Sequence, residues 1–371
     1  MTRRFVFVST LGYPPERVGG AQISTLTLAQ QLSEKGHEVE ICFPQEFEET
    51  FGQRWWRQLI GRHGVPRRRL GIRQVVFRSL RTTRFETYLA QVHQHILGTK
   101  PDLVIVGEGR TIDVAIRLCG LPNLAIFFRD VELDFQSQWT AHEARQQLAE
   151  MTFHGIANSA FVAAHFQQLT AKNIPHFPPM IDLSKYEAST SEPFLKGEEV
   201  LFVNPVPLKG LHLALEIVDL LPDVPFCFLE AWPLKGDIEE EVMKELEARP
   251  NIRFQRAISD IRQAFARSGC VIVPSKWEEA WCRVISEAQA WGLPVIARDI
   301  GGIEEALGGA GILMDRDADP ASWAQAIQEL FRAPERQEKL RALGFERAKA
   351  DDLRGDALVK HIENLANGKN H

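Results

Sequence analysis

Alternation of short apolar runs with helical patterns along the whole chain is the feature that most restricts its fold. The runs are mostly continuous and rich in β-branched and aromatic residues, which is typical of buried parallel strands. They lie at residues 5–9, 39–43, 103–106 and 124–128, and then at 200–203, 225–229, 252–254, 271–273 and 294–297. Helical patterns separate them, at 21–35, 209–221, 238–248, 260–267 and 283–291. This alternation predicts parallel sheets with helices on both faces.

The length of the chain predicts two domains. It has 371 residues, and single hydrophobic cores stop growing at about 250–300 residues. Residues 174–182 contain Pro175, Pro178 and Pro179, which interrupt both helices and central strands. We therefore predict Rossmann-like domains at 1–180 and 181–345, followed by a helical segment at 346–371. Ligands of such sheets lie beyond the C-terminal ends of the strands, which predicts a site in a cleft between the domains.

Composition excludes several classes of protein. With 44% hydrophobic and 25% charged residues, the chain has the composition of a globular protein rather than a disordered one. It contains no apolar run of about 18 residues that could span a membrane, and its short apolar N-terminal run is better interpreted as a strand than as a signal peptide. The five cysteines are scattered without a C-x-x-C pair, which predicts a reducing cytoplasm and no thiolate metal site.

The charges are unevenly distributed. The net charge of −6 argues against a general nucleic-acid binder, yet residues 54–84 hold ten arginines and no acidic residue. This segment also contains Trp55 and Trp56, and a mixture of arginine and tryptophan suits the headgroup region of an anionic membrane. A solvated basic loop and a cradle for a soluble anionic ligand such as a phosphorylated glycan remain alternatives. Nucleic acid fits less well, because the rest of the chain is acidic.

Glu279 and Glu287 form a candidate pair of ligand-binding carboxylates. The pattern places Glu279 just before the helix at 283–291 and Glu287 within its second turn. Two carboxylates so placed can accept hydrogen bonds from two hydroxyl-bearing parts of one ligand, with the free amides of the first turn facing an anion between them. The same spacing also fits an exposed stripe of ion pairs among Glu279, Arg283 and Glu287.

This segment resembles the E-x7-E signature of the family 4 glycosyltransferases, which are retaining enzymes of the GT-B fold. Glu279 and Glu287 are followed by Ala288 and then by Gly292-x-Pro294. Further motifs occur in the family's order: Pro14-Pro15-x3-Gly19-Gly20-Ala21, Ala157-Asn158-Ser159, Pro179-Met180-Ile181-Asp182, Lys209-Gly210, Pro274-Ser275 and Gly301-Gly302-Ile303-Glu304-Glu305. The resemblance covers almost the whole chain. It implies two Rossmann-like domains facing across a cleft, with the last helix returning to the N-terminal domain.

The resemblance also implies roles for individual residues. Enzymes of this fold use no bound metal, so Lys209 would neutralise the leaving diphosphate together with helix N-termini. Gly19 and Gly20 would allow backbone amides to approach the phosphates or the transferred sugar, although a tight turn with positive φ explains them equally well. Glu287 would bind the ribose hydroxyls, and Glu279 would position the transferred sugar without forming a covalent bond to it.

Three positions depart from the family's pattern. Asn204 replaces the arginine that often precedes the lysine by five residues, and Arg283 is the candidate substitute for this half of the diphosphate clamp. Trp281-Cys282 replaces Phe-Gly, which predicts a less permissive backbone. Arg129-Asp130 replaces the usual His-Asp pair. Arginine cannot serve as a general base, so proton transfer would fall to Asp130 or to the departing phosphate, and Arg129 stays a candidate for the catalytic site.

The sequence therefore predicts a cytoplasmic, retaining hexosyltransferase without metal or cofactor. It would use a nucleotide-sugar donor held by the C-terminal domain and a glycan, lipid-linked or other acceptor held by the N-terminal domain. The basic segment could bring the protein to the inner face of the membrane. We expect residues 254–260 to contact the nucleotide base. The alternative is a non-catalytic nucleotide-sugar-binding protein of the same fold. A nicotinamide dehydrogenase is disfavoured, because no G-x-G-x-x-G follows the first strand.

Overall fold

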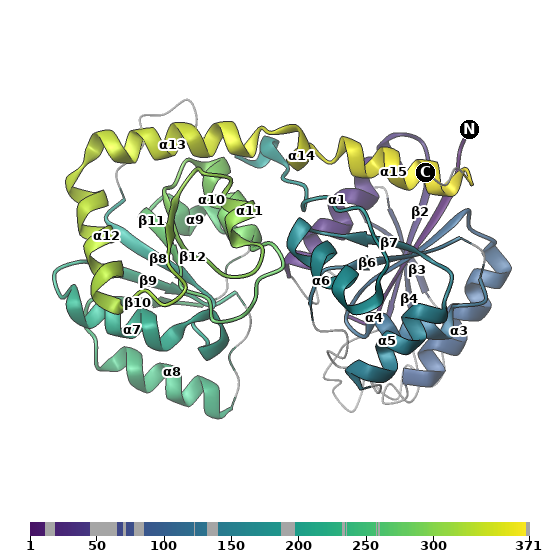
Figure 1. Cartoon of the computed structure of the whole chain (residues 1–371), viewed down its shortest axis with the longest axis horizontal. Coiled ribbons are helices and arrows are strands. Elements are labelled where there is room, and N and C mark those ends of the chain that lie inside the picture. The colour runs from purple at the N-terminus through teal and green to yellow at the C-terminus, as the bar shows by residue number, and fades with distance from the viewer. Residues whose placement is uncertain are drawn as a thin grey trace. The chain divides into compact units, whose positions relative to one another are not determined.

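The chain forms two compact units, seen in a computed structural model (Figure 1). The first comprises Met1–Met180 and Gly355–His371, and the second comprises Ile181–Arg354. The structure describes residues 1–11, 19–44, 65–69, 72–77, 85–121, 123–131, 140–186, 197–231, 234, 236–256, 258 and 260–368. Pro14 and Pro15, most of the arginine-rich segment 54–84, and residues 257 and 259 of the predicted base-binding loop lie outside these ranges. Each unit is described by itself below.

The described part of the first unit has a seven-stranded sheet in the order β3-β4-β2-β1-β5-β6-β7. The strands are β1 (Arg4–Ser9), β2 (Glu38–Pro44), β3 (Val65–Arg69), β4 (Ile72–Phe77), β5 (Leu103–Glu108), β6 (Leu124–Phe128) and β7 (His154–Ala157). Neighbours pair in parallel except β3, which is antiparallel to β4. The helices are α1 (Gly20–Glu34), α3 (Phe85–Thr99), α4 (Thr111–Arg117), α5 (Ala141–Glu150), α6 (Ala160–Thr170) and α15 (Asp356–Ala366).

Apolar side chains explain how helices cover this sheet. Leu28 and Leu32 of α1 and Ile362 of α15 share one buried cluster with Phe5 and Phe7 of β1. Figure 1 shows α3 and α4 on the other side of the sheet from α1 and α15. Because both faces are covered, the central strands consist of continuous apolar residues rather than alternating ones.

The second unit has a six-stranded parallel sheet in the order β10-β9-β8-β11-β12-β13 within the described residues. Its strands are β8 (Glu199–Val203), β9 (Phe226–Leu229), β10 (Ile252–Gln255), β11 (Ser268–Val273), β12 (Val295–Arg298) and β13 (Ile312–Met314). Its α-helices are α7 (Leu211–Leu220), α8 (Asp237–Glu247), α9 (Arg262–Phe265), α10 (Arg283–Trp291), α11 (Ile303–Leu307), α12 (Pro320–Arg332), α13 (Pro334–Ala348) and α14 (Asp351–Arg354). Helices α7, α8 and α12 bury one face of the sheet, and α9, α10 and α11 bury the other.

All nine predicted strands are confirmed, with ends that shift by at most a few residues, and the predicted helix at 283–291 matches α10. Four strands were missed. β3 and β4 lie in the arginine-rich segment, where charged residues hide the apolar pattern, and β7 and β13 are only 4 and 3 residues long. The helix predicted from residue 209 begins at Leu211, because a short 3-10 helix, η3 (Pro207–Lys209), and a turn at Gly210 precede it.

The end of the chain differs from the predicted boundary at residue 346. Helix α13 continues through that position, and α14 still belongs to the second unit. The first unit resumes at Gly355, which has a φ of +83° and where a Cβ would overlap Sδ of Met180. Only glycine fits there, so the turn into α15 depends on it.

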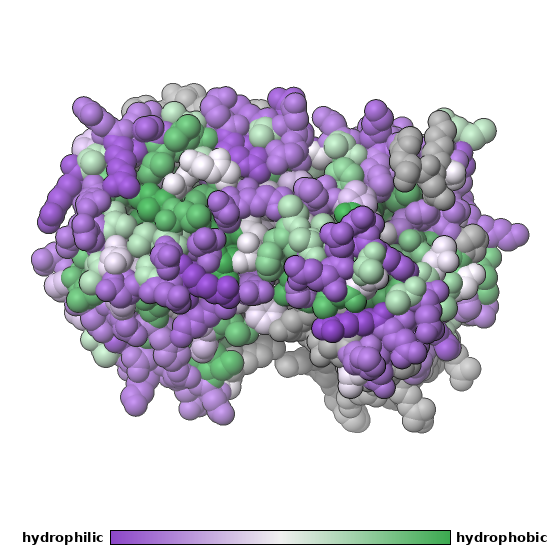
Figure 2. Space-filling view, viewed as in Figure 1, coloured by the Kyte–Doolittle hydropathy of each residue, from purple (hydrophilic) through white to green (hydrophobic). Residues whose placement is uncertain are grey.

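The face of the molecule seen in Figure 2 is mainly hydrophilic, with small apolar areas. None of the described helices combines the length and the apolar character that crossing a membrane requires.

Candidate functional site

Lys209 and Glu279 meet at the C-terminal edge of the sheet in the second unit. Lys209 ends η3, which follows β8, and Glu279 lies in the loop between β11 and α10. Because β8 and β11 are neighbours in the sheet, these loops lie side by side. The Nζ atom of Lys209 is 2.6 Å from Oε1 of Glu279, and the buried Ser275 donates from Oγ to the same oxygen at 3.0 Å. Glu279 is only 8% exposed, so its carboxylate is held by two donors away from bulk water.

Backbone contacts fix the position of Lys209. The carbonyl of Leu208 accepts hydrogen bonds from the amides of Lys276 and Trp277, each at 3.0 Å. Gly210 has a φ of +90°, and a Cβ there would overlap the carbonyl oxygen of Pro274. The Lys-Gly motif therefore has a steric reason: glycine allows the loop after β8 to touch the loop after β11.

The backbone of the glycine pair Gly301-Gly302 packs against the backbone of Glu279. The amide of Gly302 donates to the carbonyl of Glu279 at 2.6 Å. A Cβ on Gly301 would overlap that carbonyl, and one on Gly302 would lie 2.5 Å from the carbonyl oxygen of Ala280. Larger residues at either position would displace the loop that carries the carboxylate.

Arg283 and Glu287 form a second ion pair on α10. The Nε and Nη2 atoms of Arg283 donate to Oε1 of Glu287 at 3.2 and 3.1 Å. Each of the two side chains is 12% exposed. The alternative of a solvent-exposed stripe is thus wrong in two respects: the pair is mostly buried, and Glu279 bonds to Lys209 instead of joining it.

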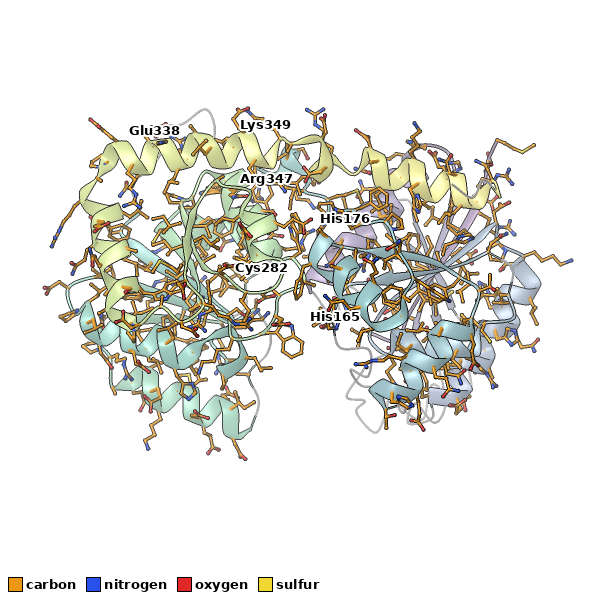
Figure 3. The ribbon with its side chains drawn as sticks, viewed as in Figure 1. His165, His176, Cys282, Glu338, Arg347 and Lys349 are labelled. Atoms are coloured by element: carbon orange, nitrogen blue, oxygen red, sulfur yellow. The ribbon has the colours of Figure 1, made fainter. Side chains whose placement is uncertain are left out.

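Cys282, labelled in Figure 3, directly precedes α10. Its backbone has a left-handed conformation, with a φ of +63°. A non-glycine residue in this region costs about 1–2 kcal/mol. Burial, followed by the charge of Glu279, raises the pKa of the thiol well above its usual value. The preceding Trp281 is buried and donates from Nε1 to Oγ of Ser286 at 3.0 Å. The backbone thus adopts a glycine-like conformation despite carrying a side chain.

Asn204 connects the ends of two neighbouring strands. It also has a left-handed backbone, with a φ of +61°, a conformation that asparagine tolerates better than most residues. Its Oδ1 accepts a hydrogen bond from the amide of Ala231 at 3.1 Å, which ties the end of β8 to the end of β9. The predicted contact of Asn204 with a ligand remains a prediction.

The predicted base-binding segment contacts a second buried carboxylate, Glu230, through Arg256. Arg256 donates from Nη1 to Oε1 of Glu230 at 3.2 Å and from Nη2 to Oε1 of Glu239 at 2.5 Å. Glu230 is 5% exposed at the end of β9. Arg256 therefore links the end of β10 to β9 and α8, and its predicted contact with a base stays a prediction.

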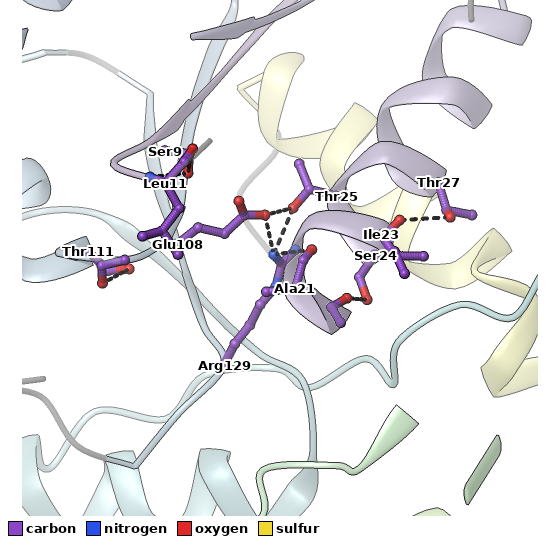
Figure 4. Close-up of polar contacts among 12 residues, drawn as sticks. Ser9, Leu11, Ala21, Ile23, Ser24, Thr25, Thr27, Glu108, Thr111 and Arg129 are labelled. Atoms are coloured by element: carbon purple, nitrogen blue, oxygen red, sulfur yellow. Dashed lines mark hydrogen bonds and ion pairs between the residues drawn. The ribbon is translucent and has the colours of Figure 1, made fainter. Parts of the chain in front are cut away.

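In the first unit, Arg129 belongs to a buried network at the C-terminal edge of the sheet (Figure 4). Its Nη1 atom donates to Oγ1 of Thr25 at 2.7 Å, to Oε1 of Glu108 at 2.9 Å and to the carbonyl of Ala21 at 3.2 Å. Thr25 in turn donates to Oε1 of Glu108 at 2.5 Å. The network joins the ends of β5 and β6 to the beginning of α1.

Glu108 is a residue that sequence reasoning missed. It is 4% exposed, and its Oε2 atom is buried without a hydrogen-bond partner among the described residues. The sequence did contain a signal for Glu108, because it is a carboxylate at the end of a continuous apolar run. A charge buried at such a position requires a partner. Glu108 and Arg129 thus form a buried ion pair in the first unit.

The other predicted residues of the first unit lie nearby. Gly19 caps α1 in an extended conformation, with a φ of −151°, and Gly20 is the first residue of the helix. The alternative of a tight turn with positive φ is therefore wrong for both glycines. Asp130 follows Arg129 and accepts a hydrogen bond from the amide of Val131 on Oδ1 at 2.8 Å.

Comparison with known protein families matches both halves of the chain. Residues 18–185 match the family model described as Glycosyltransferase Family 4, and residues 188–347 match the model described as Glycosyl transferases group 1. Together these two models account for most of both units.

Curated relatives match over shorter segments. The D-inositol 3-phosphate glycosyltransferase of Rhodococcus erythropolis is 32% identical over 62% of this chain and 57% of its own length. The enzyme of the same name from Segniliparus rotundus is 30% identical over 53% of this chain and 48% of its own length. Spore coat protein SA of Bacillus subtilis is 30% identical over 42% of this chain. The chain thus spans about half of the length of these relatives.

Solved structures match over nearly the whole chain. Sucrose-phosphate synthase from Thermosynechococcus elongatus superposes with a TM-score of 0.76 and 16% identity, covering 99% of this chain and 98% of its own. HepE of Anabaena in complex with UDP and glucose gives a TM-score of 0.75 at 19% identity, covering 98% and 99%. With both family models matched and this architecture shared, the chain belongs to the family 4 glycosyltransferases of the GT-B fold, which has two Rossmann-like α/β domains.

Proposed function

We propose that the protein transfers a sugar from a nucleotide-sugar donor to an acceptor, with retention of the anomeric configuration and without a metal ion. The observation that carries this proposal is the pairing of Lys209 with Glu279 at the C-terminal edge of the second sheet. This edge is where parallel α/β sheets bind their ligands. The relatives named as glycosyltransferases and the HepE complex with UDP-glucose support the same kind of donor.

In this proposal, the donor is held by charges on two loops of the second unit. Lys209 neutralises the diphosphate as it leaves, with Arg283 as the second cation in place of the arginine replaced by Asn204. Glu287 accepts hydrogen bonds from the ribose hydroxyls, and Glu279 accepts them from the transferred sugar. Positive charge aimed at the leaving group lowers the barrier, because negative charge develops there in the transition state.

Retention would follow if the acceptor attacks from the face that the diphosphate leaves, through a transition state like an oxocarbenium ion. Glu279 is hydrogen-bonded to Lys209 and Ser275. A carboxylate held in this way is suited to positioning a sugar rather than to attacking it. The acceptor's proton would pass to Asp130 or to the departing phosphate, because Arg129 cannot accept it.

The acceptor is proposed to bind the first unit. Its candidates are a glycan, a lipid-linked sugar or a phosphorylated polyol, the last of which is suggested by the relatives named for D-inositol 3-phosphate. A phosphorylated polyol, or a sugar linked to a lipid through a phosphate, carries a negative charge that the arginines of residues 54–84 would attract. We place the protein in the cytoplasm, at the membrane surface if the acceptor is lipid-linked.

The test is to incubate the protein with UDP-, GDP- and ADP-sugars in EDTA, without acceptor, and to measure sugar release. A thermal-shift screen identifies the donor first, because a ligand at about 100 times its Kd stabilises the folded state by about 2.7 kcal/mol. NMR of the first-formed sugar, recorded before mutarotation, shows whether its configuration is retained. Glu279→Ala should lower turnover more than nucleotide affinity.

Each outcome has a defined meaning. Nucleotide binding without turnover, here and with acceptors supplied, would favour the alternative of a non-catalytic binding protein. Strict dependence on a divalent cation would contradict the metal-free mechanism. Release of the inverted anomer would contradict retention.

A further inference from the structure

Four charged side chains at the edge of the second sheet are paired with one another. Lys209 pairs with Glu279, and Arg283 pairs with Glu287. These are the two cations that the proposed function assigns to the diphosphate and the two carboxylates that it assigns to the hydroxyl groups. Each group predicted to bind the donor thus has an internal counter-ion in the structure.

The four side chains are mostly buried, so the loss of an ion pair should change the affinity for a ligand. The exposed fractions of the side chains are 17% for Lys209, 10% for Glu279, and 12% for both Arg283 and Glu287. Removing the partner of a sheltered charge is costly, because the remaining charge keeps little contact with water. A cation that turns toward a phosphate therefore leaves a carboxylate that needs new hydrogen-bond donors.

Both pairs also lie around the same short segment. Glu279 and Arg283 flank the beginning of α10 on either side of Cys282. Glu279 and Arg283 are four positions apart, and each carries one member of a pair, so the two pairs together form one charged cluster at the start of this helix.

We propose that the donor binds by exchanging counter-ions at this cluster. Its diphosphate forms ion pairs with Lys209 and Arg283. Hydroxyl groups of its sugar and ribose donate hydrogen bonds to Glu279 and Glu287. This inference rests on the proposed function and adds a coupling to it. An anion that binds alone takes the cations away from Glu279 and Glu287 and gives these carboxylates no new hydrogen-bond donors. A nucleoside that binds alone takes Glu287 away from Arg283 and gives this cation no new anion. Each half of the donor therefore binds weakly, and the two halves together bind cooperatively.

The coupling predicts that one variant binds pyrophosphate more tightly and a nucleoside diphosphate more weakly than the wild type does. In Glu287→Gln, Arg283 no longer forms its ion pair with Glu287, so inorganic pyrophosphate should bind about fivefold more tightly than to the wild type. The nucleoside diphosphate with the largest thermal shift among UDP, GDP and ADP should bind about 5- to 100-fold more weakly, because its ribose loses a charged acceptor. Isothermal titration calorimetry in EDTA measures both affinities.

Arg283→Gln provides the reciprocal measurement. It should weaken binding of pyrophosphate and of the nucleoside diphosphate, but strengthen binding of the corresponding free nucleoside, because Glu287 is released. Glu278→Gln is the matched control: it removes a negative charge from the neighbouring position, where Glu278 pairs with Arg316 at 3.0 Å. This control should leave the ratio of pyrophosphate affinity to nucleotide affinity unchanged.

The proposal is overturned if Glu287→Gln and Glu278→Gln bind pyrophosphate equally, if pyrophosphate and nucleotide affinities change in the same direction, or if no variant binds pyrophosphate. Detection of pyrophosphate binding only in Glu287→Gln would support it. The proposed function itself is tested by a separate measurement, the turnover of nucleotide-sugars by the wild type. Absence of turnover would contradict the proposed function without affecting the comparison of pyrophosphate affinities.

Discussion

The Nζ atom of Lys209 lies 2.6 Å from Oε1 of Glu279, although 70 positions separate the two residues in the chain. They meet because β8 and β11 are adjacent strands, and because the backbone of Gly210 lies against that of Pro274. The contact joins a cation and a carboxylate at the edge of the sheet where ligands of this fold bind.

Replacement of Lys209 by alanine should severely impair turnover. It removes a cation assigned to the leaving group and leaves Glu279 with Ser275 as its remaining side-chain donor among the described residues. We expect kcat to fall about 10²- to 10³-fold, as when one donor to a developing charge is lost. The measurement is sugar release in EDTA, where the wild type should remain active. Lys244→Ala, on the exposed side of α8, is the control, and restoration of the Lys209 variant by Mg²⁺ would contradict the prediction.

Replacement of Gly210 by alanine should destabilise the second unit by about 2–4 kcal/mol, because it adds both positive-φ strain and an overlap with Pro274. Gly309 of the same unit is the control. Its φ is also positive, at +74°, but no atom of the described residues lies within 4 Å of a Cβ built there. Gly309→Ala should therefore cost only about 1–2 kcal/mol. Equal changes in the free energy of unfolding would mean that the contact with Pro274 is unimportant.

Loss of Glu108 should be more harmful alone than together with loss of Arg129. Glu108→Ala leaves the guanidinium of Arg129 buried without its carboxylate, which costs about 3–5 kcal/mol. The double variant Glu108→Ala/Arg129→Met should regain part of this loss. A double-mutant cycle on the free energy of unfolding measures the coupling, and additive effects would contradict it.

The contact of Glu363 of α15 with His37 and Lys35 should make stability depend on pH. The hydrogen bond from His37 lowers the pKa of Glu363, burial opposes this, and Lys35 lowers the pKa further. A carboxyl group with a lowered pKa in the folded state stabilises the fold above its unfolded-state pKa, here 4.5, and loses this effect as the pH falls through the folded-state value. Glu363→Gln should destabilise by about 1 kcal/mol at pH 7 and by progressively less below pH ~4.

Thermal unfolding of Glu363→Gln and the wild type across this pH range measures the difference. Glu34→Gln, on the exposed end of α1, is the control and should show little effect at either pH. A Glu363 difference that grows as the pH falls would show that the sign is wrong.

Arginines of residues 54–84 should bind anionic membranes. Arg67, Arg68 and Arg69 lie on β3, an edge strand that pairs only with β4 in the described sheet. Each basic residue near such a surface contributes about 1 kcal/mol. Co-sedimentation with liposomes should rise with anionic lipid, fall with salt and largely vanish when all three become glutamine. Glutamine at the exposed residues Lys100, Arg117 and Arg145 is the charge-matched control, and equal loss in both triple variants would contradict a specific surface.

The sequence by itself determined the architecture and the residues of interest. The mostly continuous apolar runs of β1, β5, β6, β8, β9, β11 and β12 identify buried parallel strands because burial on both faces excludes polar residues locally. Helix α10 was predicted with correct ends, since Gly292 stops it and Pro294 follows. Lys209, Glu279 and Glu287 were singled out by their positions relative to strand ends and helix starts, which are local properties of the chain.

Only the tertiary structure decided which partners these residues have. Glu279 bonds to Lys209 rather than to Arg283, because strand order and the Gly210–Pro274 contact bring distant loops together. Arg129 is neutralised by Glu108, a residue without any local motif. Pairings of this kind depend on side chains far apart in sequence that become neighbours when the sheet forms, and the cost of burying an unpaired charge then selects the partner.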